Sequence, residues 1–163
     1  KDHITLLKAL KHINNKINFR LIILGDGILK NDLEKFCVKN KLIKKIKFLG
    51  HKPNIYPYLK WSDALILSSI YEGLPNVILE AISMKKLVIS SNCPTGPKEI
   101  LENGKNGYLF KTSNYKDLAK KIEYAYFNKK NRNKKIQNSF KSLHKYELKN
   151  NLKIFLNLTN DLK

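Results

Sequence analysis

Short runs of apolar residues recur along the chain, and each is followed by a turn that contains glycine or proline. Strands are predicted at five of them: Asn18–Leu24, Ile46–Leu49, Asp63–Ser69, Leu87–Ser90 and Tyr108–Phe110. In the run Asn18–Leu24 the apolar residues are nearly continuous instead of alternating with polar ones. This pattern is typical of parallel strands that are covered on both faces of a sheet.

Segments with the periodicity of amphipathic helices lie between these runs. Helices are predicted at Lys1–Asn14, Leu29–Asn40, Asn54–Trp61, Asn76–Met84, Lys98–Leu101, Tyr115–Phe127 and from Ile136 onward, with the polar stretch 128–135 as a break. Alternating strands and helices predict an α/β domain with a doubly wound parallel sheet, flanked by helices and followed by C-terminal helices. Ligands of such sheets bind beyond the carboxyl ends of the strands.

The net charge of +19 comes almost entirely from lysine, because only Arg20 and Arg132 are arginine. Readers of nucleic-acid sequence depend on the forked guanidinium group of arginine, so no nucleic-acid partner is expected. A solvated lysine surface accounts for the charge, and attraction to anionic lipid or to phosphorylated small molecules remains an alternative. Cys37 and Cys93 lack the spacing of metal ligands and fit a reducing cytoplasm.

The stretch Ile66–Glu80 combines a buried strand, a turn with glycine and proline, and the start of a helix. Amides at the start of that helix, those of Asn76 and Val77, are expected to be free and to bind a phosphate. Glu72 and Glu80 enclose the turn with seven residues between them. Glu80 can accept two hydrogen bonds from a vicinal diol such as ribose. Spacing alone leaves an alternative open, in which Glu72 caps the helix and Glu80 is solvated.

The run from Glu72 to Glu80 resembles the E-x7-E signature of retaining glycosyltransferases of the GT-B fold, in particular the large bacterial family known as group 1. Further segments occur in the order of that family: Ile23–Gly27, Phe48–Gly50, Ala64–Ser69, Leu87–Ser90 and Asn103–Phe110. The resemblance implies a fold of two Rossmann-like domains. Residues 1–163 match its C-terminal, nucleotide-sugar-binding domain, and the first strand and the N-terminal acceptor domain are expected to be missing.

The resemblance also implies roles for individual residues. Glu72 would be the catalytic residue, contacting hydroxyls of the donor sugar and stabilising an oxocarbenium-like transition state. Glu80 would bind the ribose, and Lys1 would hold the diphosphate. Backbone amides for the sugar and the diphosphate would come from the segment that contains Gly73, Leu74, Asn76 and Val77.

Two more loops at the strand ends hold candidate donor-binding residues. Gly25 and Gly27 would let the nucleotide approach, unless they only form a turn; Lys30 replaces the third glycine of a dinucleotide fingerprint, which disfavours hydride transfer. His51 would contact the base or the diphosphate, or is simply a polar loop residue. In the loop after Leu87–Ser90, two residues would line the sugar pocket, Thr95 and Gly96.

The expected function is therefore transfer of a sugar from a nucleotide donor, most simply UDP-hexose or UDP-N-acetylhexosamine, to a growing surface glycan or a lipid-linked saccharide. Capsule, lipopolysaccharide and other polysaccharides are such glycans. Neither a metal site nor a tightly bound cofactor is expected, since the chain lacks an Asp-x-Asp motif and its histidines lack ligand spacing. The expected location is the cytoplasm, including the inner face of the membrane. The alternatives are a basic α/β module that binds RNA and, less favoured, a sugar-nucleotide epimerase.

Overall fold

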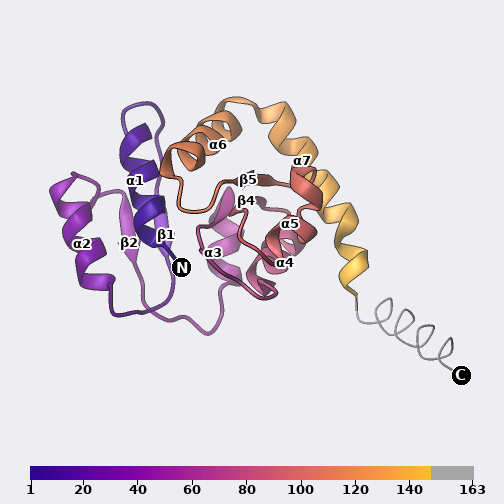
Figure 1. The fold of residues 1–163 in the computed structure, drawn as a ribbon, viewed down its shortest axis with the longest axis horizontal. Helices are drawn as coiled ribbons and strands as arrows, with labels where there is room; N and C mark the ends of the chain where they lie inside the picture. The colour runs from indigo at the N-terminus through magenta and orange to yellow at the C-terminus, as the bar shows by residue number, and fades with distance from the viewer. Residues whose placement is uncertain (148–163) are drawn as a thin grey trace, which may run out of the picture.

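Helices and strands alternate along the computed structural model, which describes residues 1–147 (Figure 1). The strands are β1 Leu21–Ile23, β2 Ile46–Phe48, β3 Ala64–Leu67, β4 Leu87–Ser91 and β5 Tyr108–Phe110. The α-helices are α1 His3–Ile13, α2 Lys30–Lys39, α3 Tyr56–Trp61, α4 Asn76–Ser83, α5 Pro97–Ile100, α6 Tyr115–Phe127 and α7 Lys129–Ser142. Residues 1–147 also contain two short 3₁₀ turns, η1 Glu102–Gly104 and η2 Leu143–Tyr146. The predicted α/β alternation is confirmed.

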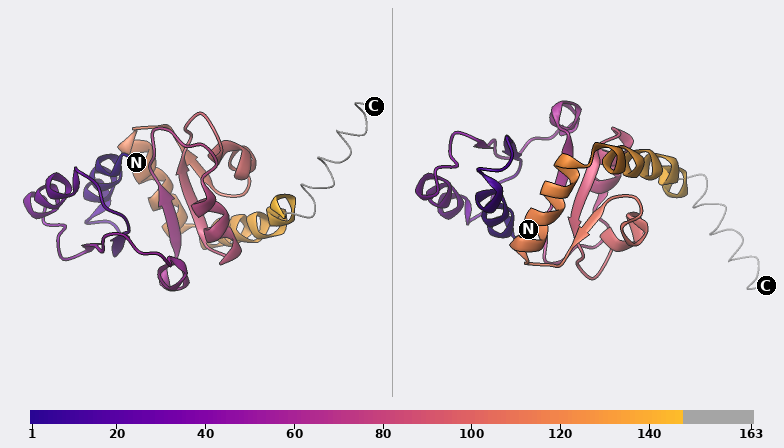
Figure 2. Two further views of the ribbon diagram at one scale, coloured as in Figure 1. Left: turned by 90° about the horizontal axis from the view of Figure 1, so that it is seen from below. Right: turned by 90° about the horizontal axis from the view of Figure 1, so that it is seen from above.

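The strands form two parallel sheets instead of the single expected one. In the first sheet β1 pairs with β2, and Leu21 lies opposite Ile46. In the second sheet β4 is central between β3 and β5, and Ile89 lies opposite Tyr108. Within residues 1–147 no hydrogen-bonded ladder joins β1 to β3. In two orthogonal views β1, β2, α1 and α2 lie to one side of the second sheet (Figures 1 and 2).

Side-chain packing holds the two sheets together in place of hydrogen bonds. One core cluster combines Leu7 of α1, Ile23 of β1, Ile89 of β4 and Leu118 of α6, all of them buried. Because α1 and α6 pack against each other, this cluster continues without interruption from the first sheet to the second. The two sheets therefore share one apolar layer.

A second core cluster covers the opposite face of β4. Ile78 and Ile82 of α4 pack there with Val88 of β4 and Leu101. Val88 and its neighbour Ile89 thus face different clusters, and all five residues of β4 are buried. Burial on both faces explains the consecutive apolar residues of β4. In β1, for which the sequence predicted the same cover, Ile22 is 45% exposed, so the cover is incomplete there.

The predicted helix break at residues 128–135 is wrong. Helix α6 ends at Phe127, Asn128 alone separates the two helices, and α7 begins at Lys129. Polar groups of α7 bind the rest of the domain: Asn131 Oδ1 accepts a hydrogen bond of 2.6 Å from the Tyr108 hydroxyl, and Lys135 Nζ lies 4.8 Å from the centre of the Tyr108 ring. These tertiary contacts stabilise a helix that shows little apolar periodicity.

None of the helices within residues 1–147 is both long enough and apolar enough to cross a bilayer.

Candidate functional site

Most of the predicted site residues lie in the loops that follow β1, β2, β3 and β4, while Lys1 precedes α1, and α4 holds Asn76, Val77 and Glu80. Parallel strands of one sheet end at the same edge, so the loops after β3 and β4 meet there, and so do the loops after β1 and β2. Two groups of contacts result. The first is centred on Glu72 in the loop after β3, and the second on Asp26 in the loop after β1.

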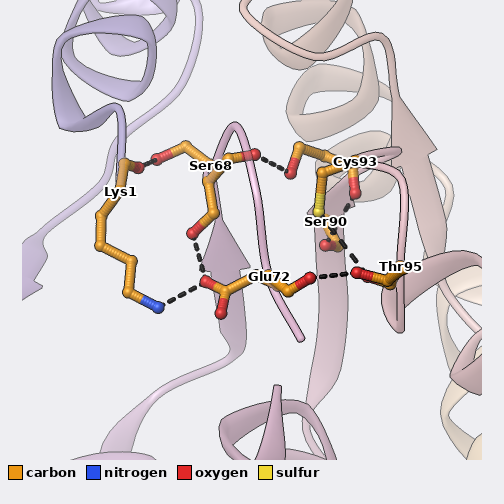
Figure 3. A network of polar contacts seen from close by, with 8 residues as sticks. Lys1, Ser68, Glu72, Ser90, Cys93 and Thr95 are labelled. Atoms are coloured by element: carbon orange, nitrogen blue, oxygen red, sulfur yellow. Dashed lines mark hydrogen bonds and ion pairs between the residues drawn. The ribbon is translucent and has the colours of Figure 1, made fainter. Parts of the chain in front are cut away.

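The Glu72 carboxylate is the centre of the first group (Figure 3). Its Oε1 atom accepts hydrogen bonds from Lys1 Nζ and from Ser69 Oγ. Lys1 lies just before α1. Its backbone is held in place because its carbonyl oxygen accepts a 2.9 Å hydrogen bond from Ser68 Oγ. Lys1 and Glu72, which are 71 residues apart in the sequence, thus form an ion pair. Both were predicted as site residues, but their pairing was not.

The Glu72 side chain is largely enclosed, with 11% of it exposed. Partial burial raises the pKa of its carboxyl, but the hydrogen bonds and positive charge of Lys1 and the hydrogen bond from Ser69 outweigh burial and hold that pKa below its ordinary value. The group is therefore a carboxylate at neutral pH. It can accept hydrogen bonds from hydroxyl groups and stabilise a positive charge that develops nearby.

Close contact between the loops after β3 and β4 fixes the position of Glu72. The Thr95 hydroxyl donates a hydrogen bond to the Glu72 carbonyl oxygen, and Ser91 Oγ donates one of 2.6 Å to the Ser69 carbonyl oxygen. Gly96 has a φ of +84°, and a Cβ atom there would lie 2.5 Å from both the Gly73 carbonyl oxygen and Pro75 Cδ. Thr95 and Gly96 thus brace the backbone of the Glu72 loop, and their predicted place in a sugar pocket stays a prediction.

The start of α4 offers fewer free amides than the sequence suggested. The Asn76 amide donates to the Leu74 carbonyl oxygen at 2.9 Å, while the Val77 amide has no hydrogen-bond acceptor within residues 1–147. The expectation of free amides thus holds for Val77 and is wrong for Asn76. Gly73 borders open space, with no atom within 4 Å of the position of a Cβ.

Glu80 lies in α4, one turn beyond Asn76, and is partly exposed. Its carboxylate forms no side-chain hydrogen bond or ion pair with the other described residues. No polar contact within residues 1–147 therefore holds this carboxylate in place, and its role as a ribose ligand stays a prediction.

The second group joins the loops after β1 and β2. The Gly25 amide donates to the Gly50 carbonyl oxygen at 2.7 Å, and both glycines have positive φ, +110° and +68°. Asp26 Oδ2 accepts a 2.8 Å hydrogen bond from the His51 amide. Gly25 and His51 are thus brought together, Gly27 next to them borders open space, and the His51 side chain is exposed.

Sequence reasoning missed the residues that hold the candidates in place. Ser68, Ser69 and Ser91 are buried hydroxyls at strand ends, and Asp26 stands between two glycines. A signal was present, since polar residues that end an apolar run lie at the ligand-binding edge of a parallel sheet. It does not tell which backbone or side-chain group each of them contacts.

The family model "Glycosyl transferases group 1" matches residues 1–142. An uncharacterised glycosyltransferase of Methanocaldococcus jannaschii is 39% identical over 125 residues, which are 76% of this chain and 28% of that protein. An α-1,4-N-acetyl-D-galactosaminyltransferase of Campylobacter jejuni, named for an acceptor linked to undecaprenol through a diphosphate, is 33% identical over 86% of this chain and 39% of its own length.

Among solved structures, the C-terminal domain of a group 1 glycosyl transferase from Francisella tularensis has a TM-score of 0.81 and 25% identity. That match covers 91% of this chain and 80% of the other. The chain thus spans less than half of the two full-length relatives but most of an isolated C-terminal domain. Its fold is the α/β fold of one half of a GT-B glycosyltransferase.

Proposed function

Because the chain belongs to the glycosyl transferases group 1 family, we propose that it is the donor-binding domain of a retaining glycosyltransferase. The observation that carries the proposal is the Glu72 carboxylate, held between Lys1 and Ser69 at the carboxyl edge of β3. A negative and a positive side chain lie side by side there. This arrangement suits a glycosidic phosphate bond, which develops positive charge on the sugar and negative charge on the leaving diphosphate as it breaks.

In this mechanism Glu72 contacts hydroxyls of the donor sugar and stabilises the oxocarbenium-like transition state. Lys1 Nζ and the free amide of Val77 face the diphosphate and stabilise the charge that it gains. The acceptor hydroxyl attacks the anomeric carbon, and the departing phosphate takes its proton. The site thus acts by positioning and electrostatics, with no covalent step on the protein.

The donor in this proposal is a UDP-hexose or a UDP-N-acetylhexosamine, and the product is a growing surface glycan or a lipid-linked saccharide. The name of the Campylobacter relative supports this choice, since it states transfer of N-acetylgalactosamine to a saccharide on a polyprenyl diphosphate. The Glu80 carboxylate, which forms no hydrogen bond or ion pair with the other residues of 1–147, is assigned to the ribose hydroxyls.

We further propose that a preceding strand and an acceptor-binding domain complete the enzyme. Strands β1 and β3 support this proposal. Each of them has one edge that pairs with no strand of the described residues, although α1 packs across the two sheets. The Lys1 carbonyl oxygen is bound by Ser68 just beyond the end of β3. A strand leading into Lys1 would run parallel to β3 and join the two sheets into one.

We also propose that the enzyme works in the cytoplasm, at the inner face of the membrane. The exposed lysines of α7 support attraction to anionic lipid headgroups, and they include Lys129, Lys130, Lys134 and Lys141. Flotation of the full-length protein with vesicles should increase with the fraction of anionic lipid and decrease with salt. Equal recovery with neutral vesicles would contradict this attraction.

Thermal-shift and calorimetric titration of the full-length protein with a panel of nucleotide sugars tests the main proposal. A UDP-sugar and UDP should raise the melting temperature and give a saturable heat of binding. Tight binding of RNA without any response to a nucleotide sugar would instead favour a basic binding module.

Replacing Glu80 by alanine should weaken UDP binding about tenfold, because two charge-assisted hydrogen bonds to the ribose would be lost. Calorimetry on the full-length protein measures the change. Glu34→Ala, which removes a partly exposed carboxylate from α2, is the matched control and should bind UDP as the wild type does. An unchanged affinity of the Glu80 variant would rule out the ribose contact.

A further inference from the structure

We propose that Asp26 is a positioning residue that fixes the nucleotide side of the donor site by holding together the loops after β1 and β2. The proposal rests on the function proposed above. Asp26 stands between two candidate contact residues of the donor, Gly25 and Gly27, and binds the backbone of a third, His51.

The two oxygens of the Asp26 carboxylate have different partners. Oδ2 accepts the His51 amide at 2.8 Å, and Oδ1 accepts Lys30 Nζ, in the first turn of α2, at 3.3 Å. One short side chain therefore connects the loop after β1 with the loop after β2 and with the helix between them.

The surrounding backbone is shaped to admit this carboxylate. A Cβ atom at Gly50 would lie 3.1 Å from Asp26 Oδ2 and 3.3 Å from Oδ1, so any side chain there would crowd the carboxylate. Gly50 also has a positive φ, which favours glycine. The glycine at position 50 and the aspartate at position 26 thus form a complementary pair across two loops.

The Asp26 carboxylate and the contacts by which it joins the two loops are called the clamp here. This carboxylate is charged under all ordinary conditions. The hydrogen bond from the His51 amide, followed by that from Lys30, holds the pKa of the Asp26 carboxyl below its usual value. Hydrogen bonds to an ionised acceptor are stronger than those to a neutral one. The other links between these loops are backbone hydrogen bonds at the strand ends, Gly25 to Gly50 and Leu49 to Ile23.

From this geometry a specific kinetic signature follows. Asp26 lies among the candidate nucleotide contacts, in a different loop from Glu72 and outside the Glu72 network. Its loss should let the loop at Gly50 and His51 move away from Gly25, so that the nucleotide has to order both loops when it binds. Donor affinity should fall, and turnover at saturating donor should change little.

Calorimetry with UDP and steady-state kinetics with the donor sugar on the full-length enzyme test this role in Asp26→Ala and Asp26→Asn. We expect about tenfold weaker UDP binding and a matching rise in KM for Asp26→Ala, with kcat within about twofold of wild type. Asp26→Asn keeps one oxygen that can accept the His51 amide and should show an intermediate loss. The control is Asp32→Ala, which removes an equal charge from the first turn of α2, where Asp32 forms no side-chain hydrogen bond with the described residues.

Each outcome decides the matter. Wild-type affinity in Asp26→Ala would overturn the clamp and leave the proposed function intact. A lower kcat with unchanged KM would also overturn it, because a smaller folded fraction alone produces that pattern. An equal loss in Asp32→Ala would reduce the effect to net charge and overturn it as well. A wild-type enzyme that binds no nucleotide diphosphate would overturn the proposed function together with this role.

Discussion

Replacing Glu72 by glutamine in the full-length protein is expected to lower kcat by about 10²- to 10³-fold, the usual cost of losing one preorganised electrostatic group. Glutamine keeps the size of the side chain and its ability to accept a hydrogen bond from Ser69, but it removes the charge that would stabilise the sugar cation. Because Glu72 contacts the sugar in the proposed mechanism, UDP affinity should stay within about threefold of wild type. Single-turnover kinetics with the donor and calorimetry with UDP separate the two effects.

Two observations would contradict this role for Glu72. Wild-type turnover in Glu72→Gln would remove the carboxylate from the mechanism, and an equal loss in a Glu99→Gln control, an exposed acid of α5, would show that the effect is not specific. The pH dependence gives a further check. Since the pKa of Glu72 lies below its ordinary value of 4.5, protonation of this group should reduce activity only at pH below that value.

Replacing Gly96 by alanine is expected to destabilise the domain by about 2–4 kcal/mol and to lower the melting temperature by about 10 °C. Alanine at a φ of +84° is strained, and its Cβ would overlap the Gly73 carbonyl oxygen and Pro75 Cδ at 2.5 Å. Both partners belong to the loop that carries Glu72, so the loop has to shift. Turnover should therefore fall at least tenfold even in the fraction that remains folded. Thermal unfolding followed by circular dichroism, together with active-site-normalised kinetics, measures both changes.

Gly27→Ala is the matched control for the melting temperature, because a Cβ at Gly27 would meet no atom within 4 Å and Gly27 lacks a positive φ. Its melting temperature should stay within about 2 °C of wild type, since neither backbone strain nor overlap is introduced. Equal melting temperatures of the Gly96 and Gly27 variants would show that the contact at Gly96 does not constrain the two loops.

Most of the architecture could be predicted from local patterns, because each strand or helix is encoded by a short stretch of residues. The buried strand β4 is the clearest case, since packing on both of its faces requires apolar residues at consecutive positions, here Leu87, Val88 and Ile89. The failure at residues 128–135 has the opposite cause. Helix α7 is stabilised by polar tertiary contacts, such as Tyr108 with Asn131, and these leave no apolar periodicity to detect.

The division of the strands into two sheets could not be predicted from the sequence either. Strand runs predict that strands exist, whereas the partner of each strand depends on which edges meet in space. Helix α1 and helix α6, distant in sequence, provide the shared apolar layer that keeps β1 close to β3 without hydrogen bonds between them.

The sequence by itself determined the α/β class, the family resemblance and the candidate residues at the strand ends, because these depend on residue type and on short spacings along the chain. Tertiary structure alone decided which of those residues meet. It paired Lys1 with Glu72, joined the Asn76 amide to the Leu74 carbonyl oxygen, and brought Asp26 of one loop to the His51 amide of another. The physical reason is that a hydrogen bond requires its two groups to lie within about 3 Å of each other, and only the folded backbone brings residues from separate strand ends that close.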